Sequence, residues 1–367
     1  MKRVNNIYNN IVTYSNISNV LDILVKNINN KKYLYNYIKY KNCFIMDILE
    51  RLYNKNYIFS KYNIFLIKDK KYRIIMSECI SDKLVNYFIS YYILIPNLGC
   101  LIDSTVATRK NKGCEYAYKL FNKYIYKLGI NNIYVLKIDI KKYFYNINHN
   151  KLKSMLERKF KDGKCLNLIY QVIDSTDSSY INAEITSIVN KEIDRVNKLN
   201  ISSKEKNIKI EELKSIPLYK KGIGLSIGCL TNQVLANFYL HDIDIYIKEK
   251  LKCKYYIRYM DDLVLLDKDK SKLNKWFKDI ESKLNNIDLE INKKSNIYRL
   301  DVGVSFLGYT YKVNNNKVII KYNKKTISKI SKRLKYLKKH NYNKYILSLN
   351  SYKGYFKRSN TKLKRYL

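Results

Sequence analysis

Two adjacent carboxylates interrupt an apolar run in the second half of the chain. The run is YYIRYMDDLVLL, Tyr255 to Leu266, and its acids are Asp261 and Asp262. The flanking residues predict a strand, a tight turn and a second strand, with both acids at the tip of the hairpin. Adjacent carboxylates repel each other, so both stay ionised only where a cation neutralises them. Mg²⁺ prefers oxygen ligands of this kind, although a bare Asp pair could equally be solvated on a turn.

A second acidic element is expected, because phosphoryl transfer by two metal ions about 3.5–4 Å apart requires carboxylates from separate elements. Asp139 meets this requirement at the end of a hydrophobic strand predicted over 132–140, within LKIDIKKYFYNINH. Taken alone, Asp139 could be a strand-end cap. Together with the Tyr-Met-Asp-Asp run, it indicates metal-assisted chemistry on a phosphate substrate.

Helices and short strands are expected around these acids. Apolar periodicity predicts helices over three further ranges, 1–60, 82–95 and 231–250. Residues 61–75 predict two strands joined by a charged turn. Residues 175–216 are polar, and we expect a mobile connection there with only a short helix near 183–198. A helically spaced apolar stripe flanked by lysines predicts a C-terminal helix through Ile327, Ile330, Leu334 and Leu337.

The chain is strongly basic. Its 367 residues include 71 Lys+Arg and 31 Asp+Glu, a formal charge of +40, and the 46% hydrophobic content argues against disorder. Nucleic acid is therefore the expected partner, although an AT-rich coding sequence could account for part of the lysine excess. No Asp or Glu follows Asp301. The apolar runs are too short to span a bilayer, so no membrane role is expected.

The spacing of cysteine and histidine along the chain argues against a disulfide framework or a zinc module. None of the seven Cys forms a C-x-x-C pair, and none of the three His has metal-ligand spacing. This usage favours a reducing cytoplasm as the location of the protein.

The YMDD run and DIKKYF together resemble two motifs of the reverse transcriptases. The resemblance implies an α+β right-hand polymerase with fingers, palm and a short helical thumb. Its expected domains are a helical segment (1–60), fingers (61–130), a palm that includes the polar connection (131–312) and a basic thumb (313–367). The implied activity is RNA-directed DNA synthesis with two Mg²⁺ ions, or Mn²⁺. An RNA template, a DNA or RNA primer and dNTPs would be the partners.

The resemblance also implies roles for the central acids. Asp139 and Asp261 would bridge both metal ions, with help from the backbone carbonyl of Ile140. Asp262 would be the supporting third acid.

Two more residues acquire roles through the same resemblance. Lys294, in LEINKKS, aligns with a lysine that protonates the leaving pyrophosphate, and Lys293 competes for that position. Phe144 aligns with an aromatic residue that lies beneath the sugar and excludes a 2′-OH. Phe144 could also serve core packing, and the two roles are compatible.

The run GIGLSIGCLTNQVLANFYL, Gly222 to Leu240, matches the nucleotide-pocket segment of the family. Ile227, Gly228 and Gln233 give the pattern I-G-x-x-x-N-Q, with Asn232 where related enzymes carry Ser. It looks like the pattern of reverse transcriptases from diversity-generating retroelements, which are error-prone opposite template adenine. Ile in place of the usual Gln removes a hydrogen-bonding side chain, and this weakens rejection of mispairs.

Three biological readings stay open. A diversity-generating retroelement enzyme would work with a small basic accessory protein. A phage-defence or group II-like enzyme is the second reading, and both would be encoded by a bacterium or a phage. The third, of another class, is a catalytically idle RNA-binding scaffold.

Basic residues are the candidate contacts to phosphates, although each could be an ordinary solvated base. Arg73 in KKYRII and Arg109 in IDSTVATRKNKGCEYA resemble finger residues that contact the triphosphate. The remaining candidates for contact with template or primer are Tyr259, Met260, Lys110, Lys112, Gly308 of the FLGY hairpin, Lys332 and Arg333.

Overall fold

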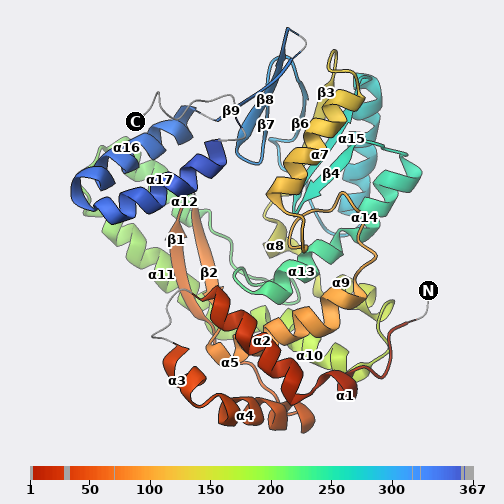
Figure 1. Ribbon diagram of the computed structural model, residues 1–367, viewed down its shortest axis with the longest axis vertical. Coiled ribbons are helices and arrows are strands. Elements are labelled where there is room, and N and C mark those ends of the chain that lie inside the picture. Colours follow the sequence, from red (N-terminus) through yellow and green to blue (C-terminus); the bar gives the residue numbers. More distant parts are fainter. Residues whose placement is uncertain are drawn as a thin grey trace. The chain divides into compact units, whose positions relative to one another are not determined.

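The computed structural model describes residues 3–28, 34–69, 71–315, 317–322, 324–356 and 359. Lys70 of the finger motif and most of the expected thumb beyond residue 356 lie outside these residues. Helices and short antiparallel strands alternate along the described chain (Figure 1), which confirms the α+β class. The chain forms two compact units: Met1–Ile102, Lys141–Asp242 and Leu284–Leu289 make the first, and Asp103–Ile140, Ile243–Lys283 and Glu290–Leu367 make the second.

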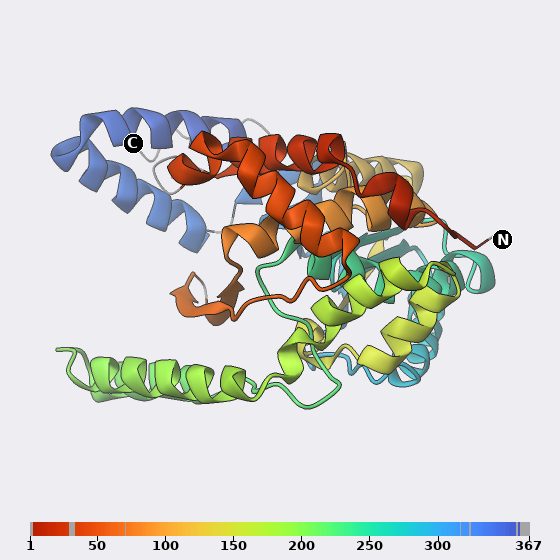
Figure 2. The same cartoon turned by 90° about the horizontal axis from the view of Figure 1, so that it is seen from below.

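The first unit begins with helices, as the sequence predicts for 1–60. They are α1 (Tyr8–Ile11), α2 (Tyr14–Asn27), α3 (Tyr35–Lys39) and α4 (Lys41–Tyr53). Thr13 caps α2 by accepting a hydrogen bond from the Asn16 backbone N–H at 3.3 Å. The buried face of α2 consists of Ile17, Val20, Leu21 and Leu24. The helix α2 packs against α4 and α5 (Ile80–Phe88), which lie beside it in Figure 2.

The predicted strand pair of 61–75 is an antiparallel ladder of β1 (Asn63–Lys68) and β2 (Tyr72–Ser77). Burial alternates along β2, where Tyr72, Ile74 and Met76 are buried. Ile74 and Met76 pack against Ile181 and Ile185 of α11 (Ser179–Asn197). The hairpin therefore rests on a long helix within its own unit.

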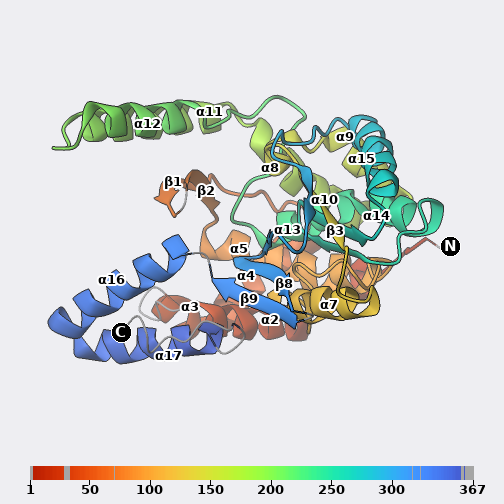
Figure 3. The same ribbon diagram turned by 90° about the horizontal axis from the view of Figure 1, so that it is seen from above.

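The prediction of a mobile connection over 175–216 is wrong, although the helix expected near 183–198 is present. This range forms α11 and α12 (Ser203–Lys214), which pack side by side (Figure 3). Val196 and Leu213 are fully buried where the two helices meet Tyr72. Leu213 is the one buried residue of α12, so the sequence carries almost no apolar stripe by which this helix could be recognised.

The rest of the first unit is helical, and the single helix predicted over 231–250 is divided. The further elements of this unit are the π-helix η2 (Ile89–Leu94), α6 (Ile95–Asn97), α8 (Tyr143–Asn146), α9 (His149–Glu157), α10 (Gly163–Asp174), the 3₁₀ turn η3 (Ser175–Asp177) and α13 (Leu230–Tyr239). After α13 the chain continues as α14 (His241–Ile245) and the π-helix η4 (Tyr246–Lys250). Among the described helices, none is both long enough and apolar enough to cross a membrane.

The second unit contains the sheet that carries the acids. Its four antiparallel strands lie in the order β4 (Tyr256–Tyr259), β5 (Asp262–Asp267), β3 (Tyr134–Asp139) and β6 (Asn296–Arg299). The prediction of a strand over 132–140 and of a strand–turn–strand over 255–267 is confirmed. Two helices of this unit, α7 (Cys114–Lys127) and α15 (Lys270–Asn285), flank the strands (Figure 1).

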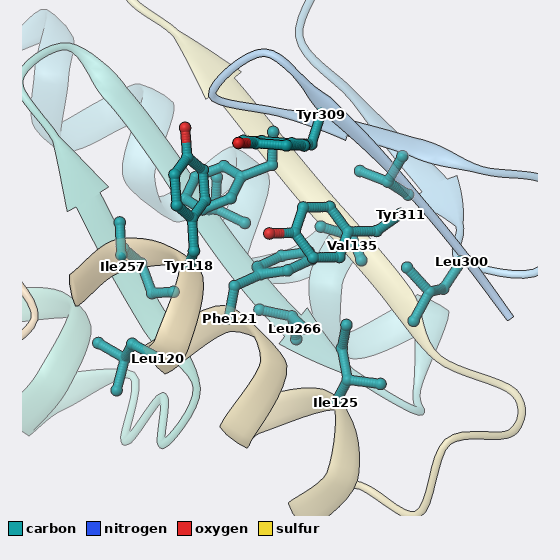
Figure 4. Close-up of a cluster of buried hydrophobic side chains, with 14 of the residues drawn as sticks. Tyr118, Leu120, Phe121, Ile125, Val135, Ile257, Leu266, Leu300, Tyr309 and Tyr311 are labelled. Carbon is teal, nitrogen blue, oxygen red and sulfur yellow. The ribbon is translucent and has the colours of Figure 1, made fainter. Parts of the chain in front are cut away.

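An aromatic core joins α7 to the sheets of the second unit (Figure 4). Phe121 of α7 stacks on Phe306 with ring centroids 4.8 Å apart and meets Tyr311 edge-on at 4.7 Å. Phe306 and Tyr311 belong to the second sheet, whose strands are β7 (Val304–Phe306), β8 (Tyr309–Asn314) and β9 (Lys317–Tyr322). Each aromatic pair of this kind contributes about 0.5–1.5 kcal/mol beyond its burial, so the core holds the strands rigidly.

The C-terminal helices α16 (Lys324–His340) and α17 (Tyr342–Phe356) pack against each other in the second unit. The predicted stripe is confirmed, because Ile327 and Leu334 are buried and Ile330 and Leu337 are half-buried. The lysines between these positions are exposed.

Candidate active site

The acidic turn connects β4 to β5, as the sequence predicts. Tyr259 pairs with Asp262 across the ladder, so Met260 and Asp261 form a two-residue turn. Met260 has a φ of 56°, in the left-handed region that residues other than glycine seldom adopt. A two-residue hairpin turn requires a positive φ, because its twist must match that of the strands.

The strand pairing brings the third acid to this hairpin. Asp139, the last residue of β3, lies directly opposite Asp262, the first residue of β5. Directly opposed residues project from the same face of a sheet, with Cβ atoms about 4.5–5.5 Å apart. Asp261 follows in the adjoining turn. The structure therefore groups the three acids, whereas Ile140 is buried and only its backbone could serve as a ligand.

The electrostatics of the acids fit a bound cation. Burial raises the pKa of Asp262 above its usual value, Lys137 opposes the shift, and the neighbouring charge of Asp139 adds to it. A divalent ion at these oxygens would relieve both the burial penalty and the repulsion. The donors are carboxylate oxygens, the ligands that Mg²⁺ prefers.

The end of β3 is held by the turn that carries Lys294. The Asp139 backbone N–H donates to Ser295 Oγ at 2.9 Å, and its carbonyl accepts from the Asn292 N–H at 2.7 Å. Lys293 and Lys294 are both exposed within this turn. The structure thus places both lysines on the turn that is hydrogen-bonded to Asp139, and both remain candidates for the proton donor.

A buried ion pair, which the sequence analysis missed, supports the turn. Arg258 of β4 binds Asp244 in a bidentate pair, with Nε–Oδ1 2.8 Å and Nη2–Oδ2 2.6 Å, and neither side chain is exposed. Its third nitrogen, Nη1, donates to the carbonyl of Met260 at 3.1 Å. The guanidinium therefore ties the acidic turn to α14.

The buried carboxylate has further donors. Tyr256 donates to Asp244 Oδ1 at 2.6 Å, and Thr105 donates to Oδ2 at 2.8 Å. One signal was available in the sequence: Arg258 is a charged residue inside an otherwise apolar strand, and such a residue is seldom buried without a partner.

The loop over residues 103–113 of the second unit is bound to the same strand. The Val106 N–H donates to the Arg258 carbonyl at 3.0 Å, and Arg109 Nη1 donates to the Thr105 carbonyl at 2.9 Å. Lys112 forms an ion pair with Asp103. This hydrogen-bonded ion pair and the Tyr116 hydroxyl lower the pKa of Asp103.

The other basic and hairpin candidates of the second unit are exposed or lie in turns. Lys110 is exposed, and so are Lys332 and Arg333 on α16. Gly308 has a φ of 91° in the turn between β7 and β8, where a residue with a side chain would be strained. Contacts of these residues with nucleic acid remain predictions.

The remaining candidates lie in the first unit. Arg73 is exposed on β2. The Met76 N–H donates to the Ile227 carbonyl at 2.8 Å. At Gly228, with a φ of 136°, an added Cβ would lie 2.6 Å from the Met76 carbonyl oxygen. Glycine is therefore required where this loop meets β2, and the neighbouring Gln233 is half-buried on α13.

Phe144 is half-buried on α8. Its backbone carbonyl accepts from the Leu225 N–H at 2.7 Å, and its ring meets that of Tyr143 edge-on at 5.8 Å. The aromatic side chain is thus fixed by packing and keeps one part accessible.

A cavity of about 330 Å³ in the first unit is lined by Gly228 and Gln233 together with Glu78 and Lys83. Glu78 is buried and accepts a hydrogen bond from Asn86 Nδ2 at 2.8 Å. Burial raises the pKa of this carboxyl to about 7.

Glu78→Gln is expected to stabilise the protein at alkaline pH. The folded state holds the Glu78 proton more tightly than the unfolded chain, so the free energy of unfolding falls as pH rises from about 4.5 to about 7. Removal of this titration should raise the free energy of unfolding at pH 8 by up to about 3 kcal/mol and leave it unchanged below pH 4.5. Urea unfolding at both pH values measures the difference. Exposed Glu50→Gln is the control, and equal curves for both variants at pH 8 would refute the prediction.

Comparison with known proteins identifies the family of the chain. Residues 66–311 match the sequence model of the family described as reverse transcriptase (RNA-dependent DNA polymerase). This match covers more than half of the chain, and the protein belongs to the reverse transcriptase family. The matched range includes Asp139, Asp261 and Asp262.

Two similar solved structures are telomerases from Candida. The apo telomerase of Candida tropicalis, truncated from its C-terminal domain, has 16% sequence identity and a TM-score of 0.46, and the alignment covers 72% of this chain and 55% of that one. The Candida albicans telomerase, in complex with a TWJ fragment of telomeric RNA, has 14% identity and a TM-score of 0.43, with 79% and 55% coverage. The chain spans about half the length of both. No curated protein matches the sequence.

Proposed function

We propose that the protein is an RNA-directed DNA polymerase that makes cDNA from an RNA template by two-metal nucleotidyl transfer. The observation that carries the proposal is the register of the four-stranded sheet, which sets Asp139 opposite Asp262 and next to the Asp261 turn. In the reaction, the primer 3′-OH attacks the α-phosphate of a dNTP and pyrophosphate leaves.

We assign separate catalytic roles to the residues of the second unit. Asp139, Asp261 and Asp262 would hold the metal ions, and Ile140 would add its backbone carbonyl. When bound, two Mg²⁺ ions would lower the pKa of the primer hydroxyl and neutralise negative charge on the pyrophosphate. Lys294 would donate a proton to the leaving pyrophosphate, which an exposed ammonium on the turn beside Asp139 can do.

Phe144→Ala is expected to admit ribonucleotides. An aromatic ring beneath the sugar rejects the 2′-OH by steric overlap, and its truncation to a methyl group removes the obstacle. We expect discrimination between dNTP and rNTP to fall by about 10–100-fold, a range typical for one steric contact in a pocket. Single-nucleotide incorporation with dGTP and GTP measures it, and Phe144→Tyr is the control that keeps the ring. Unchanged discrimination in Phe144→Ala would assign the ring to packing alone.

Binding of template and primer is proposed at basic surfaces in both units. Lys332 and Arg333 are exposed on a helix of the acid-free C-terminal region, and Arg73 is exposed on the β1–β2 hairpin. Such side chains grip phosphates without reading sequence, so binding should weaken steeply with salt.

An error-prone retroelement role is the more specific proposal. Support comes from Ile227, whose side chain can neither donate nor accept a hydrogen bond and stands where most members of the family carry Gln. Asn232, which stands where the related enzymes carry Ser, is buried and donates to Ser226 Oγ at 2.7 Å, and it does not add to this support. A small basic accessory protein would belong to this role.

Primer extension on a defined RNA template with Mg²⁺ and dNTPs tests the function. Full-length cDNA would support the polymerase, and errors clustered opposite adenine would support the retroelement role. Evenly distributed errors would favour a defence or group II-like enzyme. Salt-sensitive RNA binding without any dNTP turnover would support an idle scaffold and overturn the proposal.

A further inference from the structure

A buried imidazole in the first unit faces two carboxylates. His149, the first residue of α9, is 1% exposed. Its Nδ1 lies 3.2 Å from Asp174 Oδ1 and 3.7 Å from Asp177 Oδ2, and the three atoms lie within 4.8 Å of one another. In the described part of the chain, this nitrogen has no hydrogen-bond partner. The fold thus assembles a cluster that histidine spacing in the sequence does not predict.

The other ring nitrogen fixes the orientation of the imidazole. His149 Nε2 lies 2.7 Å from the carbonyl oxygen of Gly224, to which it can only donate. In the neutral ring the proton is therefore on Nε2, and Nδ1 presents a lone pair to the carboxylates. A ring N–H bound to a backbone carbonyl is the usual support of a histidine that binds a metal ion.

The carboxylates are oriented in the same manner. Asp174 Oδ2 accepts from Lys153 Nζ at 2.6 Å, and Asp177 Oδ1 accepts from the Gly222 N–H at 2.8 Å. Each acid thus uses one oxygen for an outer contact and turns the other toward the imidazole. The end of α10 and the following 3₁₀ turn supply the two acids, so rigid elements hold all three side chains.

We propose that His149, Asp174 and Asp177 form a binding site for one divalent transition-metal ion of the Zn²⁺ type. Zn²⁺ binds imidazole nitrogen and carboxylate oxygen at about 2.0–2.2 Å, and tetrahedral angles then separate the donor atoms by roughly 3.3–3.5 Å. The two measured separations, 3.2 and 3.7 Å, bracket this range. An imidazole ligand favours a transition ion over Mg²⁺.

The site has room for a fourth ligand and a route of entry. The Asp174 and Asp177 side chains are 41% and 26% exposed, so solvent reaches the side opposite the buried ring. A bound ion would join the start of α9 to the end of α10 and would stabilise the first unit. The competing arrangement is a protonated imidazole paired with the carboxylates, which binds no ion.

Equilibrium dialysis of the full-length protein against Zn²⁺ separates these arrangements. A background that carries both Asp139→Asn and Asp261→Asn removes two of the three carboxylates of the candidate active site, and the readout is Zn²⁺ content rather than polymerase activity. We expect one Zn²⁺ per chain by elemental analysis, and binding at least tenfold weaker in His149→Gln. The control, His340→Gln, changes an exposed histidine on α16 and should keep the ion.

Two further measurements show whether a loss of Zn²⁺ binding in His149→Gln comes from the missing ligand or from a folding defect. Asp177→Asn keeps an oxygen for the Gly222 N–H and should also bind at least tenfold more weakly. Co²⁺ in place of Zn²⁺ should give the intense visible absorption of tetrahedral coordination, and this band should disappear in both variants. Equal Zn²⁺ content in the background protein, His149→Gln and Asp177→Asn would overturn the site and leave the protonated ion pair.

Discussion

Asp261→Asn is expected to abolish primer extension while leaving the protein folded. The substitution keeps the size of the side chain and removes the charge that a metal ion needs. Several kcal/mol of transition-state stabilisation depend on that ion, so the rate should fall on the order of 10³-fold or more. Single-turnover extension on an RNA template measures the loss, with circular dichroism as the check on folding.

The control for this variant is Asp47→Asn, which changes an exposed acid on α4. It should extend the primer at the wild-type rate. Substitution of Asp139 should reproduce the loss seen at Asp261, because both acids are expected to bind both ions. Extension by Asp261→Asn at more than a tenth of the wild-type rate would contradict the assignment of the metal ligands.

Sequence pattern was sufficient where an element is strongly apolar or buries one face. The strand that follows Asp261 has four consecutive buried apolar residues, Leu263 to Leu266, and the stripe of α16 follows the helical period. It failed for α12, which buries only Leu213 and therefore shows no stripe. Helix boundaries near Leu240 were also missed, because buried residues continue across the break between α13 and α14.

For the site, the sequence identified residues of unusual type in a known pattern but not the partners that depend on register and tertiary contact. The three acids were found through their spacing. Asp244 was missed because its partner Arg258 lies 14 residues away on another element. His149 was missed as a ligand because α10 and the following turn, rather than sequence neighbours, bring its two carboxylates to it.

Arg258→Met is expected to lower the free energy of unfolding by about 3–5 kcal/mol, because it leaves Asp244 as a buried and unpaired charge. Both side chains are fully buried in the wild type. The variant also loses the hydrogen bond to the Met260 carbonyl, so the acidic turn should be less well held and extension slower. Urea unfolding followed by the fluorescence of Trp276, the one tryptophan, reports on the same unit.

A second substitution shows whether the unpaired charge is the cause. Asn at position 244 keeps an acceptor for one of the two hydroxyls, offers its amide N–H to the other, and removes the charge. Arg258→Met/Asp244→Asn should therefore be more stable than Arg258→Met alone. Arg158→Met is the matched control, since Arg158 pairs with Asp242 where the side chains are 57% and 54% exposed. It should cost about 1 kcal/mol or less. If Arg258→Met cost no more than Arg158→Met, the buried pair would not be what holds the acidic turn in place.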